Sequence, residues 1–356
     1  MQRVGAPFLF TLAIGCTASG GGSAAGANRG TADAALEGGG GALGGGGASD
    51  GSLGGNPFSW SQGTPCPLER FEAGGAVIGG ELWVLGGFVS SGLDVTRRVD
   101  IYDPSSDSWR LGPDLPSAET HLGVVTVGSD IVVIGGFDGK GNAWTTTSAV
   151  WRWRAADAAW TAGPDLPSAR AAVASAIIGT EIHAAGGLAV DGNSDLGDHV
   201  VWDLAGGASW TSASPLPEPR NHGGGAASGG LFFAIAGRHG WDETAGDSDA
   251  VDAFDPTTAT WTNRAPIPIA RSEIGGSTTT MSDGRLLVIG GSVAGVHPNA
   301  DVLIYDPSAD QWLALPPLPE PRKGAVAARI GATIVVSTGS PTSTDPSDTT
   351  FIGCCL

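Results

Sequence analysis

Six tryptophans at nearly constant spacing constrain the fold of this 356-residue chain more than any other feature. They are Trp60, Trp109, Trp160, Trp210, Trp261 and Trp312, and successive members lie 49 to 51 residues apart. A proline follows each of them seven residues later, and an arginine or, once, Glu119 follows ten residues later. Agreement at three offsets in six copies identifies an internal repeat. A repeat of this length indicates one supersecondary unit per copy, packed against its neighbours.

Two further patterns within each repeat indicate short strands joined by tight turns. An apolar run such as Ile131-Val132-Val133-Ile134 ends in Gly-Gly, although Ala236 and Thr338 replace the first glycine in two copies. An aromatic residue followed by Asp, as in Tyr102-Asp103-Pro104, precedes most of the later tryptophans. Asp accepts hydrogen bonds from the backbone beyond it and Pro fixes φ, so this pair favours a turn. The 59 Gly and 23 Pro also argue against a helical bundle.

The order of apolar strand, Gly-Gly, aromatic-Asp-Pro, Trp, Leu-Pro and Arg resembles the kelch repeat. The resemblance covers residues 57–353. It implies an all-β fold, a six-bladed β-propeller in which each repeat forms a four-stranded antiparallel blade around a central channel. In this interpretation the tryptophans belong to the core. The repeated arginines are expected to make polar contacts between blades, and His183 is expected to be a core histidine.

The two ends of the repeat region are complementary. The first partial repeat begins at Trp60 with no apolar run before it, and the last one has no Trp after residues 348–352. We therefore expect strands from both termini to close the last blade, with residues 58–60 as its outer strand. A disulfide between Cys66 and Cys354 would clip this closure. Antiparallel pairing could instead place the two cysteines at opposite ends of the blade, which leaves free thiols as the alternative.

The N-terminal residues resemble an export signal. Arg3 precedes an apolar stretch at residues 4–14, and Cys16 follows directly after small residues. This arrangement resembles a bacterial lipobox, in which the cysteine is lipidated, although Ala13 stands where Leu is commonest. An ordinary signal peptide cleaved near residues 24–27 is the alternative.

These features predict three regions: a lipoprotein signal peptide at 1–15, a disordered Gly-rich tether at 16–56 and the propeller at 57–356. The resemblance places the protein in the cell envelope, anchored to the outer membrane and either periplasmic or surface-exposed. The net charge of −18 excludes a basic face for nucleic acid, and leaves the lipid as the only expected membrane contact. We expect a monomer.

Equivalent positions of a propeller lie on rings about its axis, so residues at a constant distance from each tryptophan in the sequence should lie on one ring. Twelve residues after each tryptophan stand Glu72, His121, Ala172, His222, Glu273 and Gly324. Resemblance to ligand-binding kelch propellers implies that these residues and their predecessors face the mouth of a solvated channel, together with the loops after Gly-Gly. The candidate ligand-binding residues are Glu72, His121, Asn221, His222, Ser272, Glu273, Lys323, Arg238, His239 and Trp241. The alternative is that these side chains bond to backbone at strand ends.

The chain carries no recognisable catalytic motif, and its function is expected to be binding. No cofactor is expected, and a metal would need three or four ligands that converge. Only Tyr102 and Tyr305 are present, which argues against the tyrosine-ligated copper of galactose oxidase. The resemblance is thus to a binding module for a protein, a peptide or a glycan. The alternative is a carbohydrate-active enzyme similar to sialic-acid mutarotase, for which Glu72, Glu273 and His121 could supply an acid and a base.

Overall fold

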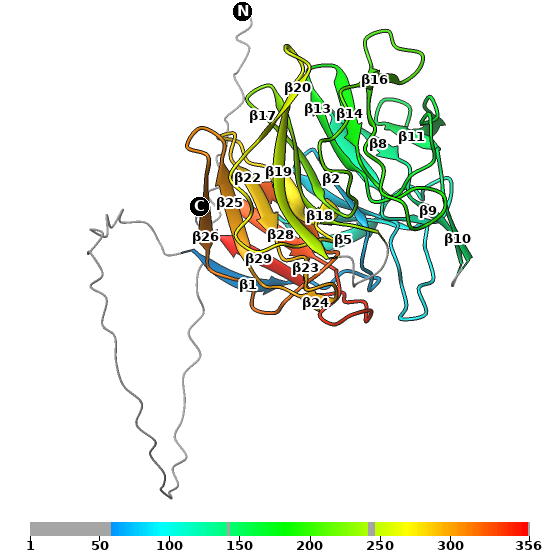
Figure 1. The fold of residues 1–356 in the computed structure, drawn as a ribbon. Helices are drawn as coiled ribbons and strands as arrows, with labels where there is room; N and C mark the ends of the chain where they lie inside the picture. Colours follow the sequence, from blue (N-terminus) through cyan, green and yellow to red (C-terminus); the bar gives the residue numbers. More distant parts are fainter. Residues whose placement is uncertain (1–57, 141–142, 241–245, 355–356) are drawn as a thin grey trace, which may run out of the picture. The chain divides into compact units, whose positions relative to one another are not determined.

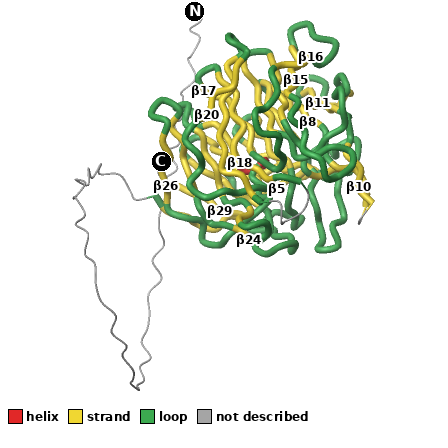
Figure 2. The backbone as a smooth tube through the Cα atoms, in the orientation of Figure 1, coloured by secondary structure: helices red, strands yellow, loops and turns green. Residues whose placement is uncertain are grey.

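The computed structural model describes residues 58–140, 143–240 and 246–354 (Figure 1). Residues 57–356 form one compact unit. The predicted signal peptide at 1–15, Cys16, the tether at 16–56 and Trp241 lie outside the described residues. The described part is built of strands and loops, with one 3-10 turn, η1 (Gly275–Ser277) (Figure 2). None of the described helices is long and apolar enough to cross a membrane.

The described residues form six four-stranded antiparallel sheets, one for each repeat. Blade 1 contains β2 (Gly74–Ile78), β3 (Glu81–Leu85), β4 (Val99–Asp103) and β5 (Ser108–Leu111). Blade 2 contains β7 (Gly123–Val127), β8 (Asp130–Ile134), β11 (Val150–Arg154) and β12 (Ala159–Ala162). Blade 3 contains β13 (Ala174–Ile178), β14 (Glu181–Ala185), β15 (His199–Asp203) and β16 (Thr211–Ala213).

The remaining three blades repeat this order from the inner to the outer strand. Blade 4 contains β17 (Gly224–Ser228), β18 (Leu231–Arg238), β19 (Asp247–Asp255) and β20 (Thr260–Asn263). Blade 5 contains β21 (Thr278–Thr280), β22 (Leu286–Ile289), β25 (Val302–Asp306) and β26 (Gln311–Leu315). Blade 6 contains β27 (Val326–Ile330), β28 (Thr333–Ser337), β29 (Thr350–Cys354) and β1 (Ser59–Gly63). Two small sheets lie in the loops: β6 (Glu119–Thr120) with β9 (Phe137–Lys140) and β10 (Ala143–Thr146), and β23 (Ser292–Val293) with β24 (His297–Pro298).

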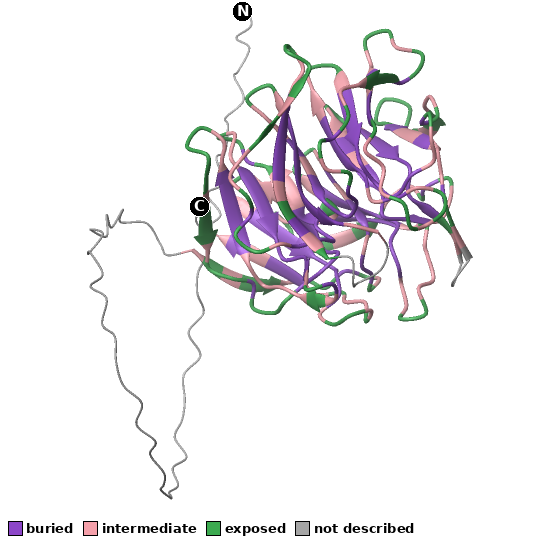
Figure 3. Ribbon diagram, viewed as in Figure 1, coloured by how far each residue is buried: buried purple, intermediate pink, exposed green. Residues whose placement is uncertain are grey.

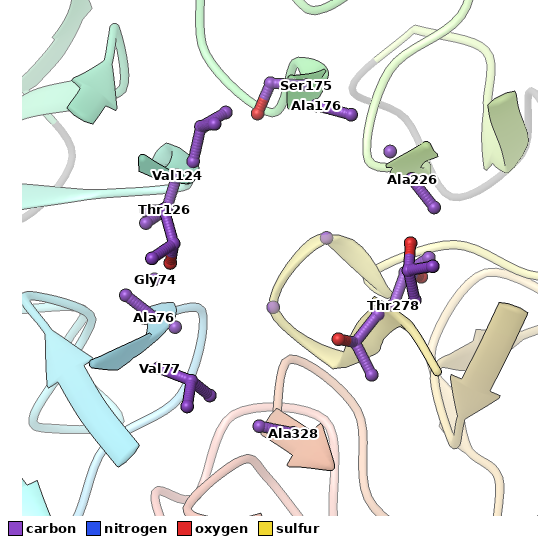
Figure 4. A pocket seen from close by; sticks show the side chains of 18 of the residues that line it. Gly74, Ala76, Val77, Val124, Thr126, Ser175, Ala176, Ala226, Thr278 and Ala328 are labelled. Atoms are coloured by element: carbon purple, nitrogen blue, oxygen red, sulfur yellow. The ribbon is translucent and has the colours of Figure 1, made fainter. Parts of the chain in front are cut away.

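The inner strands form a closed ring around a channel. Each inner strand contacts the inner strand of the next blade, and β27 contacts β2, so that blade 6 adjoins blade 1. Figure 4 shows small side chains such as Ala76, Ser175 and Thr278 around this space, which is a cavity of about 420 Å³. The second strand of each blade is apolar and buried because neighbouring blades cover both of its faces (Figure 3).

Strands from both ends of the repeat region close blade 6, as the sequence predicted. β1 pairs with β29 in antiparallel register, with Trp60 opposite Gly353. The indole Nε1 of each repeated tryptophan donates a hydrogen bond to a backbone carbonyl of the preceding blade. The acceptors for Trp60, Trp109, Trp160, Trp210, Trp261 and Trp312 are the carbonyls of Pro316, Thr64, Pro113, Pro164, Ser214 and Ala265. The Trp60 bond to Pro316 completes the circle, so the fold is the predicted six-bladed propeller.

The same register separates the two cysteines that were considered for a bridge. Cys354 lies opposite Ser59, whereas the Cys66 amide donates to the carbonyl of Asp348 at the other end of the strand pair. At about 3.4 Å per residue the two cysteines are far beyond disulfide reach. Cys66 is instead a buried, unbridged thiol, and burial raises its pKa to about 11. The free-thiol alternative therefore describes Cys66.

Candidate ligand-binding site

The repeated arginines connect neighbouring blades and are buried. The Arg271 guanidinium, for example, donates three hydrogen bonds, to the carbonyls of Ile269 and Gly290 and to the carboxylate of Asp301. Its backbone amide donates to Ser248 of blade 4, so one residue joins blades 4 and 5. Arg70, Arg170 and Arg220 make equivalent bonds to the small residue that ends the second strand. These side chains serve the fold and do not reach the axis.

Two residues beyond the arginine position, the chain forms a ring of backbone hydrogen bonds around the axis. The six residues of this axial ring all have positive φ, between +53° and +57°: Glu72, His121, Ala172, His222, Glu273 and Gly324. Five of them donate their backbone amide to the carbonyl of the ring residue in an adjoining blade, at 2.8–3.1 Å. Between blades 4 and 5 the donor is the next residue, Ile274, whose amide bonds to the His222 carbonyl. The left-handed backbone thus repeats in every blade, while the side chains differ.

Four side chains of this ring gather beside a cavity. The cavity measures about 580 Å³, and its lining includes Phe71, Glu72, Phe88, His121, Trp144, Arg238, Glu273 and Lys323. His222 is adjacent, because its ring centroid is 4.8 Å from that of His121. Sequence comparison at one offset therefore located side chains that meet in space. The expectation that these side chains line a solvated channel was wrong, however. The side chains of His121 and Glu273 are only 4% and 7% exposed, because the backbone ring holds them close to the axis.

Glu273 is the anionic centre of the cavity. Its carboxylate lies 3.0 Å from Nζ of Lys323 and 3.4 Å from Nη1 of Arg238. Glu72 stands next to it, and its nearest ion-pair partner is Nε2 of His121 at 3.8 Å. Burial and the neighbouring Glu273 carboxylate raise the pKa of Glu72 well above its usual value. The raised pKa favours the protonated form of Glu72.

The two ring histidines are neutral and have defined hydrogen-bonding roles. Burial and the Arg238 charge lower the pKa of His121 to about 3, and the same causes lower the pKa of His222 well below its usual value. Arg238 donates to Nε2 of His222 at 3.1 Å, which leaves the proton of His222 on Nδ1, facing Oδ1 of Asn221. The Thr120 hydroxyl donates to the Glu72 carbonyl, so Nδ1 of His121 donates to that hydroxyl. Nε2 of His121 is then an acceptor that faces Glu72.

Three of the predicted site residues support the cavity from outside it. Asn221 donates to Asp195, and Ser272 donates to Asp247 at 2.8 Å, so both tie loops to the ring. His239 lies between Asp195 and Glu218, with Nε2 2.8 Å from the Glu218 carboxylate. These side chains bond mainly to carboxylates of neighbouring loops and strands, not to the backbone at strand ends. Trp241, the remaining predicted residue, lies outside the described residues.

Phe71, Phe88 and Trp144, which were not among the candidate ligand-binding residues, form an aromatic wall of the cavity. The residue before each ring position forms a β-bridge with the residue that follows Gly-Gly, as Phe71 does with Phe88. Phe88 also contacts Trp144, with ring centroids 5.3 Å apart, and His121 at 5.5 Å. The position after Gly-Gly was the available signal, because in every copy it enters the loop on this side of the ring. The predicted Arg238 occupies that same position in blade 4.

His183 and His199 form a separate buried pair in blade 3. Nδ1 of His183 lies 3.0 Å from Nε2 of His199, and Phe232 and Phe254 pack against both rings. This placement agrees with a core role for His183. No group of three or more His, Cys, Asp or Glu side chains among the described residues is arranged to hold a metal ion.

Comparison with known proteins identifies the repeat. The Kelch motif family matches residues 69–116, 120–167 and 275–319. Kelch-like protein terF of Aspergillus terreus is 30% identical over 162 residues, which are 43% of this chain and 35% of that protein. Human kelch-like protein 34 is 31% identical over 179 residues, 49% of this chain and 26% of that protein. Beta-scruin of Limulus polyphemus is 30% identical over 120 residues, 33% of this chain and 13% of that protein. The chain thus spans about a third or less of these relatives' own lengths.

Proposed function

We propose that this kelch-repeat protein is an exported, lipid-anchored binding module that takes a peptide, protein or glycan group into the axial cavity. The observation that carries the proposal is the composition of that cavity. Aromatic side chains, chiefly Phe88 and Trp144, form one wall, and a buried cluster of charged groups around Glu273 forms the other. Ligand pockets typically combine a largely apolar lining with a few polar groups that fix orientation.

The cavity has the size and the rigidity that binding needs. Its volume of about 580 Å³ lies within the usual range of roughly 300–1,000 Å³ for small-ligand sites. The axial ring holds the charged side chains on a backbone that is hydrogen-bonded around the whole propeller. Little conformational entropy is then lost when a ligand binds, which favours affinity.

Binding can be tested by calorimetry with the full processed chain and panels of short peptides and oligosaccharides. Trp144→Ala should abolish the binding that the panels reveal, since the indole forms part of the aromatic wall. Leu111→Ala is the matched control, because Leu111 is an exposed apolar residue on the outer strand of blade 1. Binding that survives Trp144→Ala, in a variant with an unchanged melting temperature, would place the site elsewhere.

The anchor is the second part of the proposal, and it rests on the sequence around Cys16. A Gly-rich tether of the predicted length has an r.m.s. span of about 35 Å, enough to hold a folded head off a membrane. In a Gram-negative host the wild type should partition with membranes, and Cys16→Ser should be released or remain unprocessed. Identical fractionation and migration of the two proteins would refute lipidation.

A sugar-processing enzyme is the second candidate, and the unequal carboxyl groups favour it. Glu72, whose pKa is raised, stands beside the Glu273 carboxyl group in one cavity, where the two groups could serve as an acid and a base. Such a pair could open and close a sugar ring. Exchange NMR with reducing sugars tests this candidate: the wild type should accelerate interconversion of anomers, and Glu72→Gln and Glu273→Gln should each remove the acceleration. Rates equal to those in buffer would exclude it.

A further inference from the structure

We infer that His183 and His199 form an acid-sensitive joint between blades 3 and 4. The two histidines lie on β14 and β15 of blade 3. The aromatic side chains that pack against them, Phe232, Phe254 and Trp261, lie on β18, β19 and β20 of blade 4. The pair therefore stands at a boundary that must stay closed for the propeller to keep its ring. Such a joint is a property of the fold and does not depend on the proposed function.

The hydrogen bonds of the pair determine where its protons lie. A backbone carbonyl can only accept, so Nδ1 of His199, 3.2 Å from the Ser214 carbonyl oxygen, carries a proton. Nε2 of a neutral His199 is then an acceptor, and Nδ1 of His183, 3.0 Å away, donates to it. Nε2 of His183 is left to take up any further proton. This nitrogen is buried and has no hydrogen-bond partner among the residues that the structure describes.

The surroundings of the pair are apolar. His183 and His199 are each 1% exposed. The Phe232 ring stacks on His183 with centroids 5.5 Å apart, and the rings of Phe254 and Trp261 make T-shaped contacts with His199 at 4.5 and 5.3 Å. A charge on Nε2 of His183 would lose its water and gain no counter-charge there. The folded state therefore disfavours a third proton.

Charged groups on the neighbouring elements do not compensate for such a proton. Strands β13, β16 and β20 contain no charged residue. Glu181 and Asp203, which lie opposite each other on β14 and β15, are only partly buried. The cations Arg220 and Arg238 pair with carboxylates of their own. The other acids on or beside these elements are exposed or bonded to other groups: Asp198, Asp247, Asp249, Asp252 and Asp255.

The pair should make the folded protein less stable in acid. Burial lowers the pKa of His183 to about 4, and burial and the neighbouring His183 lower the pKa of His199 to about 3. In the unfolded chain each histidine keeps a pKa of about 6.5, so only the unfolded state takes up these protons in weak acid. The contribution of the pair to stability is therefore fully present above pH 6.5 and is lost as the pH falls toward about 4.

Loosening of this joint would reach the axial ring. The Ser214 carbonyl that accepts from His199 also accepts from Nε1 of Trp261 in blade 4, at 2.8 Å. Across the same boundary the backbone amide of His222 donates to the carbonyl of Ala172. No other blade carries a histidine at the position of His183 or His199. Acid should therefore open the boundary between blades 3 and 4 first, and with it one side of the axial cavity.

Urea unfolding tests the joint in the full chain at pH 7 and pH 5. The wild type is compared with a double variant that carries His183→Leu and His199→Leu, which leaves the Ser214 carbonyl bonded to Trp261. Other buried groups titrate in both proteins, namely Glu72, Glu119, His121 and His222, so the pair is measured as the difference between them. Between pH 7 and pH 5 the unfolding equilibrium constant of the wild type should rise about 400-fold more than that of the variant, about twentyfold for each histidine.

The matched control is His297→Leu, because His297 is an exposed histidine on β24. It should leave the pH dependence of unfolding as it is in the wild type. If the double variant has the same pH dependence as the wild type, the pair is not acid-sensitive and the inference is wrong.

Hydrogen exchange of the wild type locates the effect and does not require the variant to fold. After correction for the intrinsic exchange rate, peptides from β15 and β19 should exchange about tenfold or more faster at pH 5 than at pH 7, because acid opens their boundary. Peptides from β3 and β28, at the boundary between blades 6 and 1, should change less. A gain that is equal in all blades, or greater outside blades 3 and 4, would overturn the inference.

Discussion

The arginine positions and the axial ring lie only two residues apart in each repeat, yet they have opposite patterns of variation. Arginine occupies five of the six copies of the first position and bonds mainly to backbone of the next blade. The second position has the same left-handed backbone in all six copies but four different side-chain types. The backbone carbonyl that the arginine bonds is present in every blade, so the same residue is required in each repeat. A side chain that faces a shared cavity has no such partner, so its copies can differ.

Three positions depart from these patterns, one among the arginines and two in the axial ring. Glu119 replaces arginine in blade 2, where its buried carboxyl bonds to Ser117 instead of crossing to a carboxylate. Ala172 and Gly324 are the two ring positions that bring no functional group to the cavity.

Arg220→Met should have the largest effect. Arg220 donates to the carbonyls of Ala234 and Ala236 and pairs with Asp252 at 2.8 Å, and both charged side chains are almost completely buried. Removing one partner of a buried pair leaves an uncompensated charge, so the free energy of unfolding should fall by about 3–5 kcal/mol. Urea denaturation measures it, with the exposed Arg110→Met expected to change stability by less than about 1 kcal/mol. If Arg220→Met and Arg110→Met lowered the free energy of unfolding by similar amounts, burial of the arginine would not explain its contribution to stability.

Glu119 should give the protein a pH dependence that the arginine copies lack. Burial raises the pKa of Glu119 from 4.5 to about 7, so the folded state keeps a proton that the unfolded state loses above pH 4.5. Its contribution is fully present below pH 4.5 and is lost as pH rises through about 7, by roughly 2–3 kcal/mol. Glu119→Gln should reduce the decline in urea unfolding between pH 5 and pH 8, which is superimposed on the opposite trend of the buried histidines, and Glu72, whose pKa is also raised, should contribute a decline of the same sign that remains. Glu69→Gln, at an exposed carboxyl, should leave the decline unchanged; an undiminished decline in Glu119→Gln would assign it to another group.

The ring positions without functional groups should report backbone strain alone. Ala172 has a φ of +53°, which costs an L-residue about 1–2 kcal/mol, so Ala172→Gly should be neutral or stabilise by up to about 1 kcal/mol. Gly324→Ala should destabilise, because its φ is +56° and a Cβ atom would lie 2.8 Å from Oε1 of Glu72. Thermal unfolding compares the two variants. Opposite signs are expected, and a loss in both would mean that Ala172 contributes through packing.

The sequence predicted the fold almost completely, because six copies of Trp, Pro and Arg repeat contacts that every blade needs. The sequence also predicted that Glu72, His121, His222 and Glu273 lie close together. Residues at the same distance from each repeated tryptophan occupy the same position in each blade, and the blades form a closed ring. Their burial could not be predicted in this way, because it depends on backbone hydrogen bonds between blades. Nor could the pairing of Lys323 and Arg238 with Glu273, which joins three blades through contacts that occur once. The distance between Cys66 and Cys354 required the strand register, which composition and spacing do not specify.

Because β1 pairs with β29, blade 6 cannot close until both of these distant strands have been made. Ser59 is paired with Cys354, so β1 finds its partner strand only after residues 350–354 have been made. Until then β1 and the open side of blade 1 present unpaired backbone and apolar side chains that can associate with other chains. Closing so long a loop is slow, because the chain entropy of the intervening residues is lost before the contacts form. Closure of blade 6 is therefore expected to depend on β1 remaining soluble and accessible until β29 is available.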